Sequence, residues 1–233
     1  MRHNEVATTF PSESGVWRVG RRHAAHPGRL LARVDDANPR GGNRFDSFNA
    51  DYETTYFGTS REVCFAETLA RFRPKAELKE LVTEEWGQNG WMTPGNVPQD
   101  WRAKRVLTRN VVESPLPFVD INHQDTLASL TERPALMAGL IRFGVTELDL
   151  GIVAGNDRRV TRFLAQFLYE EVDASGVARW SGIRYLSRLG EGWECWAIFD
   201  RRAIHIREEE RMSIEKTESN LVAVATRYGL TVH

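Results

Sequence analysis

A single carboxylate, Glu67, lies on the face through which a predicted helix should pack against the rest of the protein. At about 100° per residue, it shares one narrow helix face with Val63, Ala66 and Ala70. A carboxylate among packed side chains costs free energy unless it is paired or used. Two interpretations stay open: Glu67 has a functional role, or it pairs with Arg71 at i+4 and extends to solvent.

Three other side chains have types and positions that suit ligand binding. Tyr56 lies on a predicted strand eleven residues before Glu67, where its ring could stack on a flat ligand or fill the core. Arg44 follows a Gly-Gly-Asn loop, in which backbone amides and a guanidinium can approach a phosphate together, although a solvated loop charge explains the pattern equally well. Ser187 ends a predicted strand without a GxSxG motif or a nearby His, so we interpret it as a hydrogen-bonding residue or a strand-end cap.

No metal site is predicted. His23 and His26 lie in a loop rich in Pro and Gly, without a helix to aim both rings and without the carboxylate of an HExxH motif. The two cysteines, Cys64 and Cys195, form neither a zinc pattern nor a disulfide framework. The sequence also lacks an apolar run long enough to cross a bilayer and an apolar signal segment, so we expect a cytoplasmic protein without a membrane association.

The composition indicates one elaborated globular domain. The chain has 233 residues and a net charge of −1, which is not the bulk positive charge of a protein that binds nucleic acid. Of the 31 basic residues, only four are Lys and the others are Arg. The planar guanidinium of Arg binds phosphate and carboxylate oxygens through paired hydrogen bonds better than Lys does. A coding bias in the source explains the excess of Arg as well.

The elements that would position these residues are strands and helices in mixed order, which predicts an α+β fold with strands in more than one cluster. Strands are expected at 16–19, 54–57, 106–112, 116–121, 183–186, 195–199 and 203–206. Helices are expected from a Thr59–Glu62 capping box to a stop at Pro74, and at 75–86, 123–143 with a break near Pro134, 157–172 and 213–228. Loops are expected at 20–43 and 87–101.

Taken in order, separated pieces of the chain resemble the RES-domain family, whose name cites an Arg, a Glu and a Ser. The resemblance runs from about residue 16 to residue 207. The pieces are Trp17-Arg18, Gly42-Asn43-Arg44-Phe45, Tyr56, Ala66-Glu67, the strand Gly182-Ile183-Arg184-Tyr185-Leu186-Ser187, and Trp196-Ala197-Ile198-Phe199. The chain departs from the family where Asn43 interrupts the usual Gly-Gly-Arg, where many members have Asn in place of Cys195, and in the greater length between Glu67 and Ser187.

The resemblance implies a fold similar to that of ADP-ribosyltransferases, a core of short β-sheets with flanking helices. Residues 1–14 are polar and lack periodicity, which predicts a flexible arm. The expected division then continues with the RES-like domain at 15–210, which has a helical insertion at about 75–150, and a C-terminal helix at 211–233 that packs on the domain. Several members of the family are toxins of bacterial toxin–antitoxin pairs, so the implied partner is a helix-turn-helix antitoxin, with no direct binding of nucleic acid.

The same resemblance implies an enzyme that consumes NAD as its substrate and needs no metal. Its catalytic residues here would be Glu67 and Arg44, and its NAD-binding residues Arg18, Arg44, Tyr56 and Ser187. Because nicotinamide leaves as a neutral molecule, one carboxylate should suffice, whereas an ordinary glycosidase needs two. Glu67 would stabilise the oxocarbenium-like ribose, the two arginines would hold the pyrophosphate, Tyr56 would stack on nicotinamide, and Ser187 would hydrogen-bond the amide or its ribose.

The acceptor of the ADP-ribosyl group stays open among water, phosphate and a macromolecular side chain. Protein-directed transferases often carry a second Glu or Gln two positions ahead of the catalytic one, where this chain has Phe65, which counts modestly against protein modification. The competing class is a non-enzymatic interaction module, for which the pairs Arg21-Arg22, Arg158-Arg159 and Arg201-Arg202 could bind acidic partners, although solvated faces explain them better.

Overall fold

The computed structural model describes residues 5–22, 38–74 and 94–233, and its largest element is an eight-stranded sheet with the order β1-β6-β7-β8-β3-β2-β5-β9. Within the described residues, β6 and β7 are the one parallel pair of this sheet. The strands are β1 (Thr8–Thr9), β2 (Val16–Arg21), β3 (Thr54–Gly58), β5 (Arg105–Glu113), β6 (Phe118–Asp120), β7 (Gly182–Leu186), β8 (Glu194–Phe199) and β9 (His205–Ser213), and a second small sheet pairs β4 (Asn96–Val97) with β10 (Thr231–Val232).

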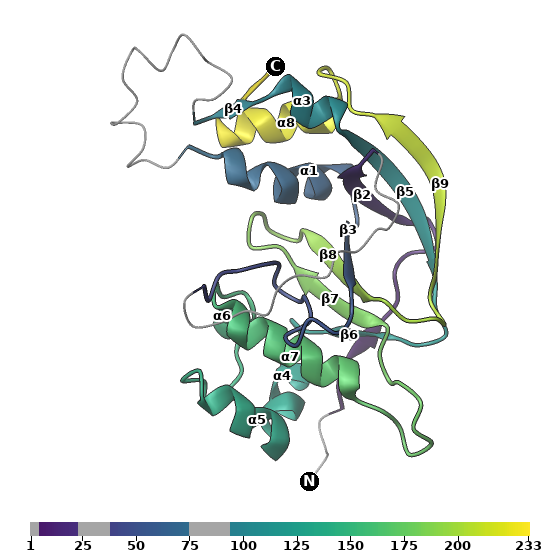
Figure 1. Ribbon diagram of the computed structural model, residues 1–233, viewed down its shortest axis with the longest axis vertical. Coiled ribbons are helices and arrows are strands. Elements are labelled where there is room, and N and C mark those ends of the chain that lie inside the picture. The colour runs from purple at the N-terminus through teal and green to yellow at the C-terminus, as the bar shows by residue number, and fades with distance from the viewer. Residues whose placement is uncertain (1–4, 23–37, 75–93) are drawn as a thin grey trace.

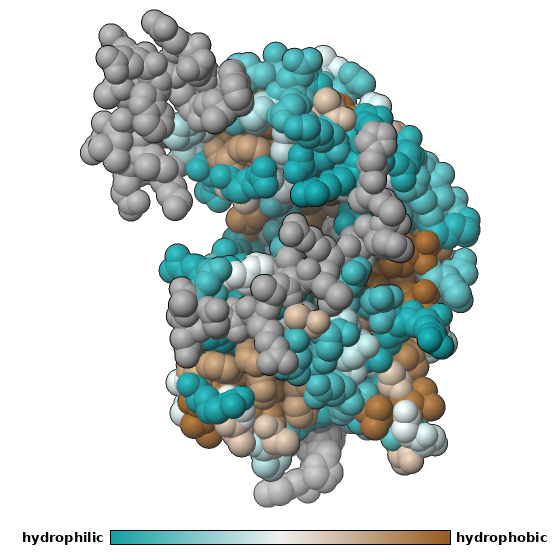
Figure 2. Space-filling view, viewed as in Figure 1, coloured by the Kyte–Doolittle hydropathy of each residue, from teal (hydrophilic) through white to brown (hydrophobic). Residues whose placement is uncertain are grey.

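The helices form two groups at the two ends of the curved sheet (Figure 1). One group consists of α1 (Arg61–Leu69), α3 (Gln99–Ala103) and α8 (Ser219–Tyr228). The other consists of α4 (Gln124–Thr131), α5 (Pro134–Ile141), α6 (Leu150–Val153) and α7 (Arg158–Glu170). Each group buries its own apolar cluster, with Leu69 and Leu221 in the first and Leu164 and Ile183 in the second. The space-filling view shows a notch in the outline between the two groups (Figure 2).

Strand β3 occupies an interior position of the sheet, between β8 and β2. Its sequence Thr-Thr-Tyr-Phe-Gly pairs antiparallel with β8, and Tyr56 lies opposite Ala197. The strand ends at Gly58, where an added Cβ would lie only 2.9 Å from Cγ1 of Val63. The absence of a side chain at Gly58 leaves room for Val63, so that α1 begins soon after the strand. A strand followed directly by a helix is the order predicted from the sequence.

The start of α1 differs from the predicted capping box. Ser60, not Thr59, is the N-cap, and its side chain accepts a hydrogen bond from the Val63 amide. The Thr59 hydroxyl instead donates to Glu194 on β8, at 2.9 Å. Helix α1 ends at Leu69 and continues as a 3-10 turn at Ala70–Phe72.

Two predictions near the chain ends are wrong. The arm predicted at 1–14 contains β1, which pairs with β6 at the edge of the sheet. The strand predicted at 203–206 is a nine-residue strand reaching Ser213, so the last helix begins at Ser219 and not at 213. The charged run at 207–211 shows no alternation of apolar residues, and its pairing with β5 at the sheet edge, rather than its side-chain pattern, makes it a strand.

The other predicted strands and helices that lie within the described residues are confirmed to within a few residues, including the break at Pro134, which is the first residue of α5. The insertion expected at about 75–150 is not a helical addition to the core, because it contains β5 and β6 of the eight-stranded sheet. In the predicted loop at 87–101, residues 96–97 form β4 and α3 begins at Gln99. The helix predicted at 75–86 and the residues at 87–93 lie outside the described part of the chain, as do residues 23–37. None of the described helices combines the length and the apolar character needed to span a bilayer.

Candidate active site

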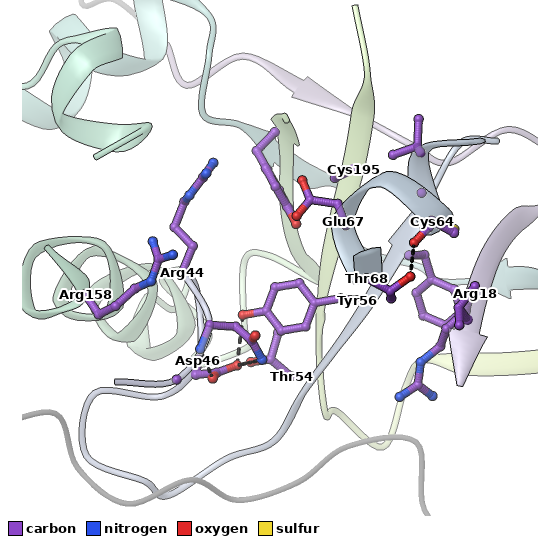
Figure 3. Close-up of a pocket in the computed structure, with 17 residues that line it drawn as sticks. Arg18, Arg44, Asp46, Thr54, Tyr56, Cys64, Glu67, Thr68, Arg158 and Cys195 are labelled. Atoms are coloured by element: carbon purple, nitrogen blue, oxygen red, sulfur yellow. Dashed lines mark hydrogen bonds between the residues drawn. The ribbon is translucent and has the colours of Figure 1, made fainter. Parts of the chain in front are cut away.

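A cleft of about 580 Å³ lies where α1, β2, β3, α7 and the loop before β3 meet. Four of the five residues predicted from the sequence line it together: Arg18, Arg44, Tyr56 and Glu67. Figure 3 shows Arg44 on one side of the Tyr56 ring and Arg18 on the other, with the Glu67 carboxylate pointing into the space toward Arg44. The fifth residue, Ser187, is not among the residues that line the cleft.

Glu67 projects from α1 into the cleft and is exposed there. The helix packs on both sides of it, because Val63 belongs to one apolar cluster and Phe65 and Ala66 belong to the other. Among the residues that the structure describes, none forms a hydrogen bond or an ion pair with the Glu67 carboxylate. Arg71, the alternative partner at i+4, lies over the ring of Phe72 at 4.8 Å instead. Glu67 is therefore an open carboxylate in a cleft and not half of a structural ion pair.

The hydroxyl of Tyr56 holds the loop that carries Arg44. It donates to Oδ1 of Asp46 at 2.9 Å and accepts from the Phe45 amide at 3.0 Å. Asp46 in turn accepts a 2.7 Å hydrogen bond from the Asn43 amide. Burial and the neighbouring Asp46 carboxylate raise the pKa of Tyr56 well above its usual value, so the phenol stays protonated as this donor. Tyr56 thus positions the loop, and its half-buried ring borders the cleft.

Helix α7 holds the same loop from its other side. Arg162, which is 1% exposed, donates from Nε to the Ser47 carbonyl at 3.0 Å and from Nη1 to the Gly41 carbonyl at 3.4 Å. One turn later, Oε1 of Gln166 accepts from the amides of Phe48 and Asn49. The loop is therefore attached to a helix more than 100 residues away in sequence, with separations of 115 to 121 residues.

Arg44 is only 9% exposed although it follows a Gly-rich loop. Its guanidinium carbon lies 5.3 Å from the ring centre of Tyr185 and 5.9 Å from that of Phe45. Its Nε is buried without a hydrogen-bond partner. A solvated loop charge, one of the two explanations that the sequence left open, does not describe this side chain.

Arg18 lies on β2, on the other side of the cleft (Figure 3). Burial lowers the pKa of its guanidinium, and the adjacent Cys64 opposes that shift. Because Tyr56 separates Arg18 from Arg44 in this view, the two arginines face the cleft from different sides. A single pyrophosphate that contacts both arginines would therefore have to reach across the cleft. The assignment of both residues to the pyrophosphate stays a prediction.

In a comparison with known protein families, residues 15–218 match the family model of the RES domain. The chain belongs to the RES-domain family. The RES fold is also similar to that of a chain in the crystal structure of the M. tuberculosis MbcT-MbcA toxin-antitoxin complex, at 11% sequence identity and a TM-score of 0.50. That similarity covers 96% of this chain and 93% of the other, and at this identity it concerns the fold alone. No curated protein matches the chain in sequence. The predicted family and the predicted α+β class are both confirmed.

Ser187, the serine that the resemblance assigns to the site, is buried at the end of β7. Its amide donates to the Trp193 carbonyl at 2.7 Å, and its Oγ accepts from the Leu189 amide at 3.1 Å. This geometry is that of a strand-end cap, one of the two interpretations made from the sequence. Its predicted contact with a ligand stays a prediction.

The two cysteines of this RES domain line the cleft, and both are buried. Burial raises the pKa of the Cys64 thiol to about 12 and that of Cys195 well above its usual value. Because the thiolate is the reactive form, we expect neither cysteine of the native protein to react with a thiol reagent at pH 8 within minutes, and both to react in urea. Rapid labelling of the native protein, followed by absorbance, would contradict this expectation.

Removal of the Tyr56 hydroxyl should loosen the loop. We expect Tyr56→Phe to lower the free energy of unfolding by about 1 kcal/mol in urea denaturation, because the Phe45 amide loses its acceptor. Tyr52→Phe is the matched control, since the Tyr52 hydroxyl is buried without a hydrogen-bond partner and its loss should cost nothing. Equal effects of the two substitutions would show that the Tyr56 hydrogen bonds do not hold the loop.

The sequence analysis did not assign Arg158 to the cleft, and it did not single out the helix face behind this residue. Arg158, Arg162 and Gln166 follow one another at i+4 spacing, so they form one polar stripe along α7. That spacing was visible in the sequence beside the apolar stripe of the same helix. Arg158-Arg159 was expected to be a solvated pair, yet Arg158 lines the cleft and Arg159 pairs with Asp157 at 2.6 Å.

In each of the other two arginine pairs, the structure shows one arginine in contact with neighbouring groups of the protein. Arg201 packs over the Tyr169 ring at 4.2 Å and donates to the Trp180 carbonyl. Arg22 donates to the Ala103 carbonyl and to the Ser213 hydroxyl. Within the described residues, no group of three or more His, Cys, Asp and Glu gathers in a way that could hold a metal ion; His23 and His26 lie outside those residues.

Proposed function

We propose that this RES-domain protein cleaves the bond between nicotinamide and ribose in NAD. The observation that carries the proposal is the Glu67 carboxylate, which no described residue pairs with and which lies in a cleft bordered by the Tyr56 ring and by guanidinium groups. Cleavage of this bond releases neutral nicotinamide and leaves positive charge on the ribose. A carboxylate beside the ribose stabilises that charge as it develops, and no second carboxylate is needed to protonate the leaving group.

The cleft residues suit the remaining parts of NAD. The ligand carries two phosphates, and a planar guanidinium such as that of Arg44 or Arg18 binds phosphate oxygens through paired hydrogen bonds. The ring of Tyr56 offers an aromatic face to the nicotinamide. NAD is the substrate in this proposal, and the chemistry needs no metal.

We further propose that the protein is the toxin of a toxin–antitoxin pair and that a helix-turn-helix antitoxin neutralises it. Two findings support this part: the RES domain covers most of the chain, and the similar fold comes from a toxin-antitoxin complex. Depletion of NAD would be the toxic effect, so the antitoxin would have to close the cleft or distort it. The enzyme would act in the cytoplasm, where NAD is available.

Water or phosphate is the acceptor that we favour over a protein side chain. The residue two positions before Glu67 is Phe65, which is fully buried in the apolar cluster of α1 and α8. No acidic or amide side chain at that position is available to orient a protein acceptor. A mono-ADP-ribosyltransferase that modifies proteins would use such a side chain, whereas a glycohydrolase or a phosphorylase does not need one. We therefore favour the latter two activities.

The test is the release of nicotinamide from NAD by the purified full-length protein, followed by chromatography with and without inorganic phosphate. Release in both conditions, with ADP-ribose as the other product, identifies a glycohydrolase. Release that depends on phosphate, with a phosphorylated ADP-ribose as product, identifies a phosphorylase. No release in either condition, together with binding to a protein or a nucleic acid, would favour the interaction module and refute the proposal.

A further inference from the structure

Two arginines with unsatisfied buried nitrogens meet at one side of the cleft. Arg44 comes from the loop before β3, and Arg158 is the first residue of α7. Both line the cleft, and Figure 3 shows both side chains on the same side of it, across from Glu67. The Nε atoms of both are buried and have no hydrogen-bond partner in the described structure.

Such an arrangement costs free energy in the unliganded protein. A buried N–H donor without a partner costs about 1–3 kcal/mol. Burial lowers the pKa of Arg158, and the positive charge of Arg44, followed by that of Arg188, lowers it further, which shows that the guanidinium groups repel one another. No carboxylate forms an ion pair with either side chain among the described residues. Arg44 and Arg158 thus combine like charges, buried donors without a partner among the described residues, and open volume beside them.

We propose that Arg44 and Arg158 together form a binding subsite for a phosphate-type anion. An anion between the two guanidinium groups would receive hydrogen bonds from both and would remove their mutual repulsion. Two sources have this chemistry: the diphosphate of a dinucleotide and free inorganic phosphate. The dinucleotide source rests on the proposed function, whereas the anion subsite itself does not.

The surrounding contacts hold the two arginines in place for this task. Arg162, one turn after Arg158, donates to the carbonyls of Gly41 and Ser47, which flank Arg44 in the loop. The Arg158 amide donates to the Pro39 carbonyl, and its Nη1 donates to the Gly155 carbonyl at 3.2 Å. The two guanidinium groups are therefore presented by a helix and a loop that are bound to each other.

The experiment is calorimetric titration of the full-length protein with ADP-ribose, inorganic phosphate and nicotinamide. We expect Arg158→Gln to weaken the binding of ADP-ribose at least about 10-fold and to leave nicotinamide binding unchanged, because only the former carries phosphates. Arg159→Gln is the matched control: it removes the same charge one residue along, from a side chain held by Asp157, and it should change binding less than about twofold. Arg158→Lys, which keeps the charge but loses the planar fork, should bind ADP-ribose more weakly than the native protein and more tightly than Arg158→Gln.

The ligands separate the two sources of the anion. Displacement of inorganic phosphate by ADP-ribose would assign the subsite to the diphosphate, and simultaneous binding of both would assign it to free phosphate. Native-like binding of ADP-ribose and phosphate by Arg158→Gln, an equal loss in Arg159→Gln, or no binding of either ligand by the native protein would overturn the subsite. If Arg158→Gln does not fold, Arg158→Lys decides, and native affinity in that variant would overturn the subsite.

The outcome also separates this inference from the proposed function. A protein that releases nicotinamide from NAD with unchanged KM and kcat in Arg158→Gln would retain the function and lose the subsite. A protein that binds ADP-ribose through Arg158 but never releases nicotinamide would retain the subsite and lose the function.

Discussion

Substitution of Glu67 by Gln is expected to slow nicotinamide release from NAD at least about 100-fold. The change removes the charge and keeps the shape of a side chain that forms no hydrogen bond or ion pair within the described structure. The free energy of unfolding should therefore stay within about 0.5 kcal/mol of the native value, because an exposed side chain is altered. Initial rates at saturating NAD and urea denaturation measure the two quantities.

Glu62→Gln provides the matched control on the same helix. Glu62 forms a 3.0 Å ion pair with Arg227 on α8 and does not line the cleft. This variant should keep the native rate, and at most it should lose a few tenths of a kcal/mol of stability, as expected for a partly exposed ion pair. A native rate in Glu67→Gln would remove this carboxylate from the mechanism, even if nicotinamide release by the native protein is established.

Substitution of Arg162 by Met is expected to destabilise the protein by about 3 kcal/mol. The guanidinium is almost fully buried, and its removal leaves the carbonyls of Ser47 and Gly41 without their donor. The loop that carries Arg44 should then become mobile. Urea denaturation measures the loss of stability, and hydrogen exchange of the amides at 41–51 should show protection lost there before the rest of the protein opens.

Arg142→Met is the control for Arg162→Met. Arg142 is exposed, and its Nε donates only to the Gly139 carbonyl of its own helix, so its loss should cost less than about 1 kcal/mol. Equal destabilisation by the two substitutions would show that the buried guanidinium does not support the loop. Loss of nicotinamide release in Arg162→Met without loss of stability would instead assign Arg162 a direct role in the cleft.

The order of short motifs along the chain predicted five residues for one site, and four of them line the same cleft. These four residues lie on different elements: Arg18 and Tyr56 on strands, Arg44 in a loop and Glu67 on a helix. No periodicity in the sequence connects them, and they were grouped only by the resemblance to the RES family. The wheel of α1 placed Glu67 beside Val63 and Ala66 correctly. It could not show that the helix packs between two apolar clusters, so that the side chain emerges in a cleft and not in a core.

What the sequence could not show depends on contacts between distant segments. The charged strand β9 forms because β5 offers it hydrogen bonds, not because residues 207–211 alternate. The polar stripe of α7 forms hydrogen bonds with the loop at 41–51, which lies more than 100 residues earlier in the sequence. The spacing of the polar residues alone could not identify this partner. The resemblance assigned Ser187 to the site, yet its strand ends in a turn in which the hydroxyl accepts a hydrogen bond from the Leu189 amide.

The pairing of β3 with β8 has a consequence for synthesis of the protein. Tyr56 is placed by a strand whose residues come about 140 positions later, and the loop before it is attached to α7. A nascent chain that has emerged only as far as α1 contains Glu67, Arg44 and Arg18 but cannot assemble them, because their supports have not yet been translated. An incomplete translation product that ends before β8 and α7 therefore lacks the supports that bring the cleft residues together.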